Sequence, residues 1–225
     1  MSLYGRWTIS AQEYATEVRR YQDEIGLMEW AAPQDWMCEP FIVAKTGLSV
    51  VEHQRRTVSN LLELRTLAPD VPWVPVLQGW TLSDYICHVE MYDAAGVDLR
   101  QECLVGLGSI CRRQGTAEAE RIVKRLAAIG IQLHGFGFKV SGLWRCADAL
   151  ASADSMAWSY RARRSPPLPG HHHKNCANCL EYALRWRERV IILIETRCRW
   201  QQQTFDLWCQ DRASGECTGN VRCAI

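Results

Sequence analysis

The sequence lacks a long apolar run and lacks any excess of charge of one sign. Its longest aliphatic run spans residues 190–194, whereas a membrane-spanning helix needs about 20 apolar residues. Lys and Arg total 26 against 25 Asp and Glu, a formal net charge of +1, so no global field attracts nucleic acid. We therefore expect no membrane partner, and nucleic-acid binding would have to come from local basic patches.

The start of the chain also lacks the charged and apolar segments of a secretory signal. The 11 cysteines are scattered through apolar stretches, where a free thiol behaves as a small buried hydrophobe. These features favour a reducing, cytoplasmic setting over a disulfide framework.

What the chain does contain is an alternation of short β-rich runs and helical stretches, which is typical of βα units around a parallel sheet. Strands are predicted at residues 26–30, 73–77, 103–106, 131–134 and 151–153. Helices are predicted at residues 10–24, 48–67, 81–97, 116–129 and 140–150, and a long amphipathic helix from 180 to about 208. This spacing favours an α/β fold of the TIM-type (β/α) barrel class.

Polar or glycine-rich residues follow each predicted strand, at the end where barrel enzymes place their chemistry. They are Gln34-Asp35, Gln78-Gly79, Gly106 to Ser109, His134 to Gly137 and Asp154-Ser155. Taken singly, a glycine that ends a strand or an aspartate that caps a helix explains each of them. Their recurrence at one face favours a functional site.

A cluster of metal-ligand residues lies in the pattern H-x-H-x2-C-x2-C, formed by His171, His173, Cys176 and Cys179. Imidazole nitrogens and thiolates are the ligands that tetrahedral Zn²⁺ prefers, and four protein ligands make a site structural. His172 in place of a neighbour, or Cys198 as a distal ligand, is the alternative set, and a solvated histidine loop is the simpler interpretation. We expect a barrel domain over residues 1–164, a zinc-binding loop and long helix over 165–208, and a flexible tail over 209–225.

The order of these motifs resembles the tRNA-guanine transglycosylase superfamily, in particular its DNA-modifying, DpdA-like branch. The resemblance rests on the segment Ala32-Pro-Gln-Asp-Trp-Met-Cys-Glu-Pro40, then Val76-Leu-Gln-Gly79, Val105-Gly-Leu-Gly108, Leu133-His-Gly-Phe-Gly137, Ser152-Ala-Asp-Ser155 and the His/Cys cluster. It implies a glycosyltransferase, a pentosyltransferase that exchanges guanine in DNA for a 7-deazaguanine such as 7-cyano-7-deazaguanine. Such members occur largely in phages and genomic islands, so the implied setting is a host cytoplasm.

The resemblance also assigns roles to residues. Asp154 matches the nucleophile, which forms and releases a glycosyl ester; a helix N-cap is its simpler interpretation. Asp35 matches the aspartate that recognises the base, and Gln78 offers donors and acceptors to the same ring. The backbone N–H groups of Gly106, Leu107 and Gly108 are expected to hold the ring carbonyl. His134 either stacks on the purine or helps in proton transfer, or it is a satisfied core histidine.

DNA as a substrate implies an extruded nucleoside and basic residues that grip phosphates. The candidates are Arg112, Arg113, Arg161, Arg163 and Arg164, for which a solvated charged face is the ordinary interpretation. The 7-deazaguanine base is the second expected partner. A homodimer and accessory DNA-modification proteins are further partners that the resemblance allows.

The sequence departs from the family in one respect: an Asp-Ser-Gly-Gly-Phe type motif is expected before residue 3 and is not found. About five strands are visible where a closed barrel has eight. An upstream start, another segment that supplies the motif, or an inactive truncated paralogue each explains this. A non-catalytic, zinc-stabilised nucleic-acid-binding protein and a tRNA-guanine transglycosylase therefore stay open as alternative functions.

Overall fold

The computed structural model describes residues 6–210, with side chains to residue 197. It is a mixed α/β structure with a parallel sheet of four strands in the order β1-β2-β3-β4. The strands are β1 (Val76–Leu77), β2 (Val105–Leu107), β3 (Leu133–Gly135) and β4 (Ser152–Ala153). The helices are α1 (Ala11–Ile25), α2 (Pro40–Thr46), α3 (Val50–Leu67), α4 (Leu82–Ala94), α5 (Ala117–Ala128), α6 (Val140–Cys146), the 3-10 turn η1 (Ala147–Ala149), α7 (Ala157–Ala162) and α8 (Leu180–Gln210). The α/β class with a parallel sheet is thus confirmed.

Side-chain caps begin the helices that surround the sheet. Ser10 and Glu13 form a capping box at α1, and Thr81 and Asp84 form another at α4. Thr116 accepts the backbone N–H of Ala119 at the start of α5. Each cap satisfies N–H groups that have no partner within the helix, so the sequence fixes where these helices start.

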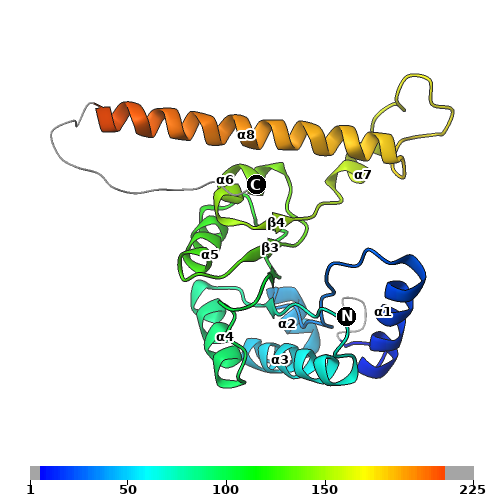
Figure 1. Cartoon of the computed structure of the whole chain (residues 1–225), viewed down its shortest axis with the longest axis vertical. Coiled ribbons are helices and arrows are strands. Elements are labelled where there is room, and N and C mark those ends of the chain that lie inside the picture. The colour runs from blue at the N-terminus through cyan, green and yellow to red at the C-terminus, as the bar shows by residue number, and fades with distance from the viewer. Residues whose placement is uncertain (1–5, 211–225) are drawn as a thin grey trace.

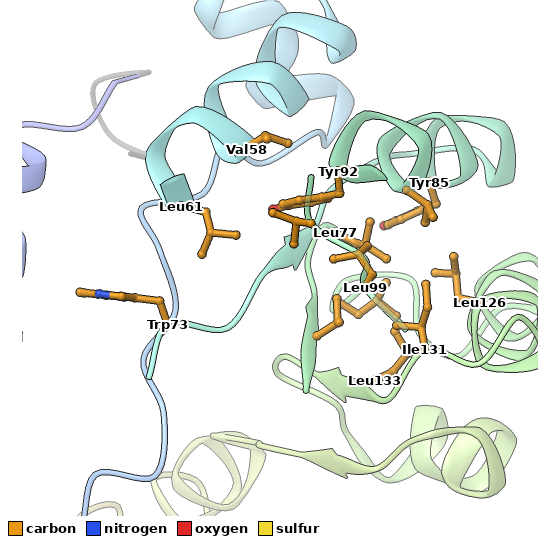
Figure 2. Packing of buried hydrophobic residues seen from close by; sticks show 14 of the residues in the cluster. Val58, Leu61, Trp73, Leu77, Tyr85, Tyr92, Leu99, Leu126, Ile131 and Leu133 are labelled. Atoms are coloured by element: carbon orange, nitrogen blue, oxygen red, sulfur yellow. The ribbon is translucent and has the colours of Figure 1, made fainter. Parts of the chain in front are cut away.

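The core lies between the outer face of the sheet and the helices. Helices α3, α4, α5 and α6 pack side by side in chain order, and α8 lies along α6 and α7 (Figure 1). Figure 2 follows the packing from Leu61 on α3 through Leu77 and Tyr92 to Leu126 on α5, all fully buried. The hydroxyl of Tyr92 donates to the Val76 carbonyl at 3.0 Å. The buried polar atom of this ring is therefore satisfied within the core.

The inner face of the sheet carries a different set of residues. Register pairs Val76 with Gly106, Gly106 with His134, and His134 with Ser152. Because side chains alternate along a strand, the residues two positions further on share this face and form the next row. That row is Gln78, Gly108, Phe136 and Asp154.

The predicted strand at residues 26–30 is wrong. Gly26 and Leu27 have φ values of 68° and 56°, which a strand does not allow, and only Ala31 pairs, through a parallel bridge to Trp73. This segment nevertheless reaches across the inner face, since the ring of Trp30 lies 4.8 Å from that of His134 on β3. Closure into a TIM barrel stays a prediction.

Other boundaries also differ from expectation. Strands β1, β2 and β3 are shorter than or shifted from the predicted runs, α6 ends at Cys146, and α2 and α7 were not predicted. The long helix is present as α8. No helix in the described part of the chain is both long and apolar enough to cross a membrane. The domain boundaries at 164 and 208 stay predictions. Residues 211–225, which make up most of the expected tail, lie outside the described residues.

A matched pair on α3 tests the core. Leu61 is fully buried, whereas its neighbour Leu62 is 38% exposed. We expect Leu61→Ala to lower the free energy of unfolding by about 2–5 kcal/mol, because it leaves a cavity, and Leu62→Ala to change it by roughly 0.5 kcal/mol or less. Urea unfolding followed by circular dichroism measures both; equal losses would contradict this packing.

Candidate functional site

A pocket of about 230 Å³ opens at the carboxyl ends of β1, β2 and β3. This volume is below the range that is usual for sites that bind drug-sized ligands, so the pocket suits one small ring system. Its lining residues are Ala32, Asp35, Met37, Glu39, Gln78, Leu107, Ser109, Cys111 and Phe136. Three predicted residues, Asp35, Gln78 and Leu107, therefore meet in it.

Asp35 lies on an irregular segment that α3 holds in place. The backbone N–H of Gln34 donates to Asn60 Oδ1 at 2.8 Å, and that of Trp36 donates to Thr57 Oγ1 at 2.9 Å. Burial raises the pKa of Asp35 to about 6, and a hydrogen bond from Gln78 opposes this rise. The carboxyl group is thus enclosed and directed at Gln78.

Gln78 is fully buried and is held at both its backbone and its side chain. Its N–H donates to His88 Nδ1 at 2.9 Å, and its carbonyl accepts from Gln54 Nε2 at 2.7 Å. Burial lowers the pKa of His88 to about 3, so this ring is neutral and Nδ1 can accept. The side chain of Gln78 contacts Asp35 through Nε2, and Ser109 through Oε1.

Gly106 on β2 and Gly108 just after it have a different role from the one expected. The N–H groups of Gly106 and Gly108 donate to Pro75 and Leu77 carbonyls at 2.8 and 2.9 Å, so they are not available to a ligand and that part of the prediction is wrong. A Cβ at Gly106 would lie 2.4 Å from the Phe136 ring, and one at Gly108 would lie 2.1 Å from Gln78 Nε2. These positions leave room for pocket side chains.

His134 lies beneath the pocket, at 5% exposure. Its Nδ1 is 2.8 Å from Ser152 Oγ, while Nε2 is buried without a partner among the described residues. Its ring meets those of Trp30 and Phe136 edge-on, with centroids 4.8 and 4.9 Å away. Burial lowers the pKa of His134, and the nearby charge of Asp154 opposes this.

Asp154 is exposed at the end of β4 and does not line the pocket. Its Oδ1 accepts the backbone N–H of Gly137, the residue after the pocket-lining Phe136. Along the inner row, Asp154 and Gln78 are separated by three strand spacings, about 14 Å in total. The sheet thus brings the two predicted aspartates to the same edge, one inside the pocket and one beside it.

The predicted basic residues do not behave alike. Arg113 is a structural residue: its Nη2 contacts the Trp80 carbonyl, its Nη1 lies 3.3 Å from Glu118, and its side chain is 9% exposed. It stacks on the Trp80 ring at 4.1 Å, so its prediction as a phosphate contact is not supported. The other four arginines, Arg112, Arg161, Arg163 and Arg164, are exposed.

The His/Cys cluster assembles as the spacing predicts. The ligand atoms of His171, His173, Cys176 and Cys179 all lie within 4.8 Å of one another. A tetrahedral zinc site spaces its ligands by about 3.3–3.8 Å, and His173 Nε2 lies 3.0 Å from Cys176 Sγ. The donor set therefore fits a metal of the zinc type after small adjustments. His172 is exposed and outside this group, and the side chain of Cys198 lies outside the described residues.

Several residues of both sites were missed from sequence. Glu181 Oε2 lies 2.9 Å from His171 Nε2, which leaves Nδ1 for the metal, as in sites where a carboxylate orients a ligating histidine. Glu39, Ser109 and Phe136 also line the pocket. Ser109 and Phe136 lie within the predicted site segments and Glu39 within the motif at residues 32–40, but the sequence analysis assigned none of the three a role of its own.

Comparison with known proteins agrees with the resemblance found in the sequence. Neither the curated proteins nor the solved structures give a match. A protein-family model described as "DpdA: DeoxyPurine in DNA protein A" matches residues 1–222. Because this match covers nearly the whole chain, the chain belongs to the DpdA family, which gives it a role in DNA modification.

Proposed function

We propose that this protein is a DNA guanine transglycosylase that exchanges guanine for a 7-deazaguanine, such as 7-cyano-7-deazaguanine. The observation that carries the proposal is the inner row at the carboxyl edge of the sheet. Asp35 and Gln78 stand at one end of that row and Asp154 stands at the other. Membership of a family named for deoxypurines in DNA supports the substrate class.

The separation along the row suits a purine nucleoside. A hydrogen bond at the base edge and an attack distance at the sugar each take about 3 Å. The roughly 14 Å along the row separates the backbones of Gln78 and Asp154, and the two side chains and the nucleoside would fill this span together. Asp35 would accept from the N–H and amino donors of the ring, while Gln78 and the Phe136 ring would orient it.

Asp154 would act as the nucleophile. The Gly137 N–H donates to its Oδ1, which orients the carboxylate and leaves Oδ2 to attack the anomeric carbon. The new C–O bond replaces the C–N bond to guanine, whose N9 keeps the electron pair and takes up a proton from solvent; the N9 proton that the incoming base later loses returns to solvent. The 7-deazaguanine then attacks through N9, loses its N9 proton and displaces Asp154, so two inversions give net retention. His134, with a free Nε2 near Asp154, would be positioned to support the base or a proton transfer.

DNA binding would have to be local, because the net charge is only +1. The target nucleoside must leave the base stack, which costs a few kcal/mol. Exposed Arg112 beside the pocket, and Arg161, Arg163 and Arg164 on and after α7, are the side chains we propose to grip phosphates. The His/Cys cluster would hold structural zinc, which would fix the loop before α8 and supply no reacting group.

Nucleoside analysis tests this function directly. DNA from cells that express the chain and make 7-cyano-7-deazaguanine should contain a deazaguanine deoxynucleoside detectable by mass spectrometry, and DNA from cells expressing Asp154→Asn should not. A deazaguanine nucleoside found in tRNA alone would favour the tRNA enzyme. Its absence from both, with folded metal-loaded protein, would favour a non-catalytic nucleic-acid-binding protein or an inactive paralogue.

The nucleophile can be tested by covalent trapping on guanine-containing single-stranded DNA. Asp154→Asn should lower the yield of denaturation-resistant adduct by at least about 1000-fold, because an amide cannot form the glycosyl ester. Asp148→Asn, an exposed aspartate on η1, is the matched control and should trap normally. Adduct that survives in Asp154→Asn would remove this residue from the role.

Metal binding can be tested without activity. Purified protein should contain about one zinc per chain, and Cys176→Ser should abolish it and lower the melting temperature, because metal binding contributes folding free energy. Cys87→Ser, an exposed cysteine outside the cluster, should keep the metal. Zinc content is measured by elemental mass spectrometry. Equal zinc content in the two variants would contradict Cys176 as a ligand.

A further inference from the structure

The pocket contains a chain of four polar side chains with a carboxyl group at each end. Glu39 Oε2 lies 3.0 Å from Ser109 Oγ, which lies 2.5 Å from Gln78 Oε1, and Gln78 Nε2 contacts Asp35 Oδ2. Glu39, Ser109 and Gln78 are 4%, 6% and 0% exposed. No lysine or arginine is among the described residues that line the pocket. Two acids therefore share an enclosed site without a lining cation.

The hydroxyl of Ser109 sets the hydrogen-bond pattern of this chain. A hydroxyl has one proton and two lone pairs. Ser109 Oγ already accepts the backbone N–H of Cys38 at 2.7 Å, which leaves one lone pair and one proton for two neighbours. Of Glu39 and Gln78, one must therefore donate to Ser109 while the other accepts.

Two arrangements satisfy this count. In the first, protonated Glu39 donates to Ser109, Ser109 donates to Gln78 Oε1, and Gln78 Nε2 donates to ionised Asp35. In the second, the Gln78 amide is turned by half a rotation: Asp35 carries the proton and donates to Oε1, and Nε2 donates to Ser109, which donates to ionised Glu39. An amide's O and N positions are interchangeable in a structure of this kind.

Both arrangements place a single proton on the two carboxyl groups. If both were ionised, one contact of the chain would lack a hydrogen in either orientation of the Gln78 amide, at Ser109 in the first and between Gln78 Oε1 and Asp35 in the second, and the two negative charges would repel. Glu39 also contributes to the raised pKa of Asp35.

Most other titratable groups that face the chain of polar side chains are neutral. Burial raises the pKa values of the thiols and phenols that face it, so they stay protonated at neutral pH; these are Tyr14, Cys38, Tyr85 and Cys111. Arg112 and Lys139 act on Cys111, and Arg113 acts on Tyr85, each by lowering the pKa, but none of these cations lines the pocket. Arg112 lies over the Phe41 ring and Arg113 beside Glu118. Asp84 accepts the N–H groups of Trp80 and Thr81.

We propose that Glu39 and Asp35 share one proton through Ser109 and Gln78, and that this makes Glu39 a specificity-determining residue for guanine-type bases. The identity of the base rests on the proposed function; the shared proton does not. In the first arrangement the pocket presents an N–H of Gln78 beside the ionised Asp35. This pair complements guanine, whose ring carbonyl accepts and whose neighbouring N–H and amino groups donate. In the second arrangement Gln78 presents Oε1 in place of the N–H, which favours a base with an amino group where guanine has its carbonyl. Guanine binding would thus favour the first arrangement, with the proton on Glu39 and Asp35 ionised, which is the orientation of Gln78 in this structure.

Infrared difference spectroscopy of the ligand-free protein at neutral pH tests the shared proton. Wild type should show the C=O stretch of a carboxylic acid that both Glu39→Gln and Asp35→Asn lack, because either amide lets the remaining carboxyl group ionise. Glu63→Gln, an exposed glutamate on α3, should keep it. Loss in only one of the two pocket variants, or no such band in folded wild type, overturns the proposal, whatever the protein's activity.

Calorimetric binding of free guanine against 2,6-diaminopurine tests specificity. Ser109→Ala and Glu39→Ala each break the chain and should lower the preference for guanine by roughly tenfold, whereas the conservative Glu39→Gln, whose amide still donates to Ser109, should restore it. Equal loss in Glu39→Ala and Glu39→Gln would contradict the assigned direction of the chain, and no loss in Glu39→Ala would contradict the role of Glu39. Failure of wild type to bind guanine, with the infrared band present, would count against the proposed function and leave the shared proton standing.

Discussion

The parallel register of four short strands decides which side chains can share a ligand. Two residues beyond the pairing of Gly106 with His134, the inner face presents Gln78, Gly108, Phe136 and Asp154 side by side. A slip of one residue in any strand would turn its contribution toward the helices, because side chains alternate between faces. Two tyrosines hold this register from the helix side of the sheet. Tyr92 donates to the Val76 carbonyl on β1, and Tyr85 donates to the Gly108 carbonyl just after β2.

Within that row, Gln78 is the residue on which the pocket depends. It is fully buried, and a buried amide without partners costs about 1–3 kcal/mol. His88, Gln54, Asp35 and Ser109 remove this cost by bonding its backbone and side chain. The missing side chain at Gly108 leaves space for it. The recognition surface is therefore built before a ligand arrives, which lowers the ordering cost of binding.

The sequence predicted most helices, the parallel sheet and the metal cluster, because caps, periodicity and ligand spacing are local signals. It did not predict α2, since Pro40 marks a break in a periodic pattern although Pro also suits the first position of a helix. Glu39 directly precedes that helix, so it was missed with it. Its partner Ser109 is 70 residues away in the chain, which no local pattern shows. Arg113 was misassigned because only the fold brings Trp80 and Glu118 to it. Long-range partners of this kind leave no pattern in a single sequence.

The two sites are linked through α7. This helix begins three residues after Asp154, and its Ala162 and Trp158 pack with Cys176, Tyr182, Leu168 and Cys179 in a second apolar cluster. A metal held by the cysteines would therefore fix the far side of the helix that follows Asp154. Nothing in this cluster touches Asp35 or Gln78, whose supports come from α3 and α4. Metal loss should consequently loosen the Asp154 end of the row before it affects the pocket at Asp35 and Gln78, so that an ion in this cluster would bear on the proposed catalysis without contacting the substrate.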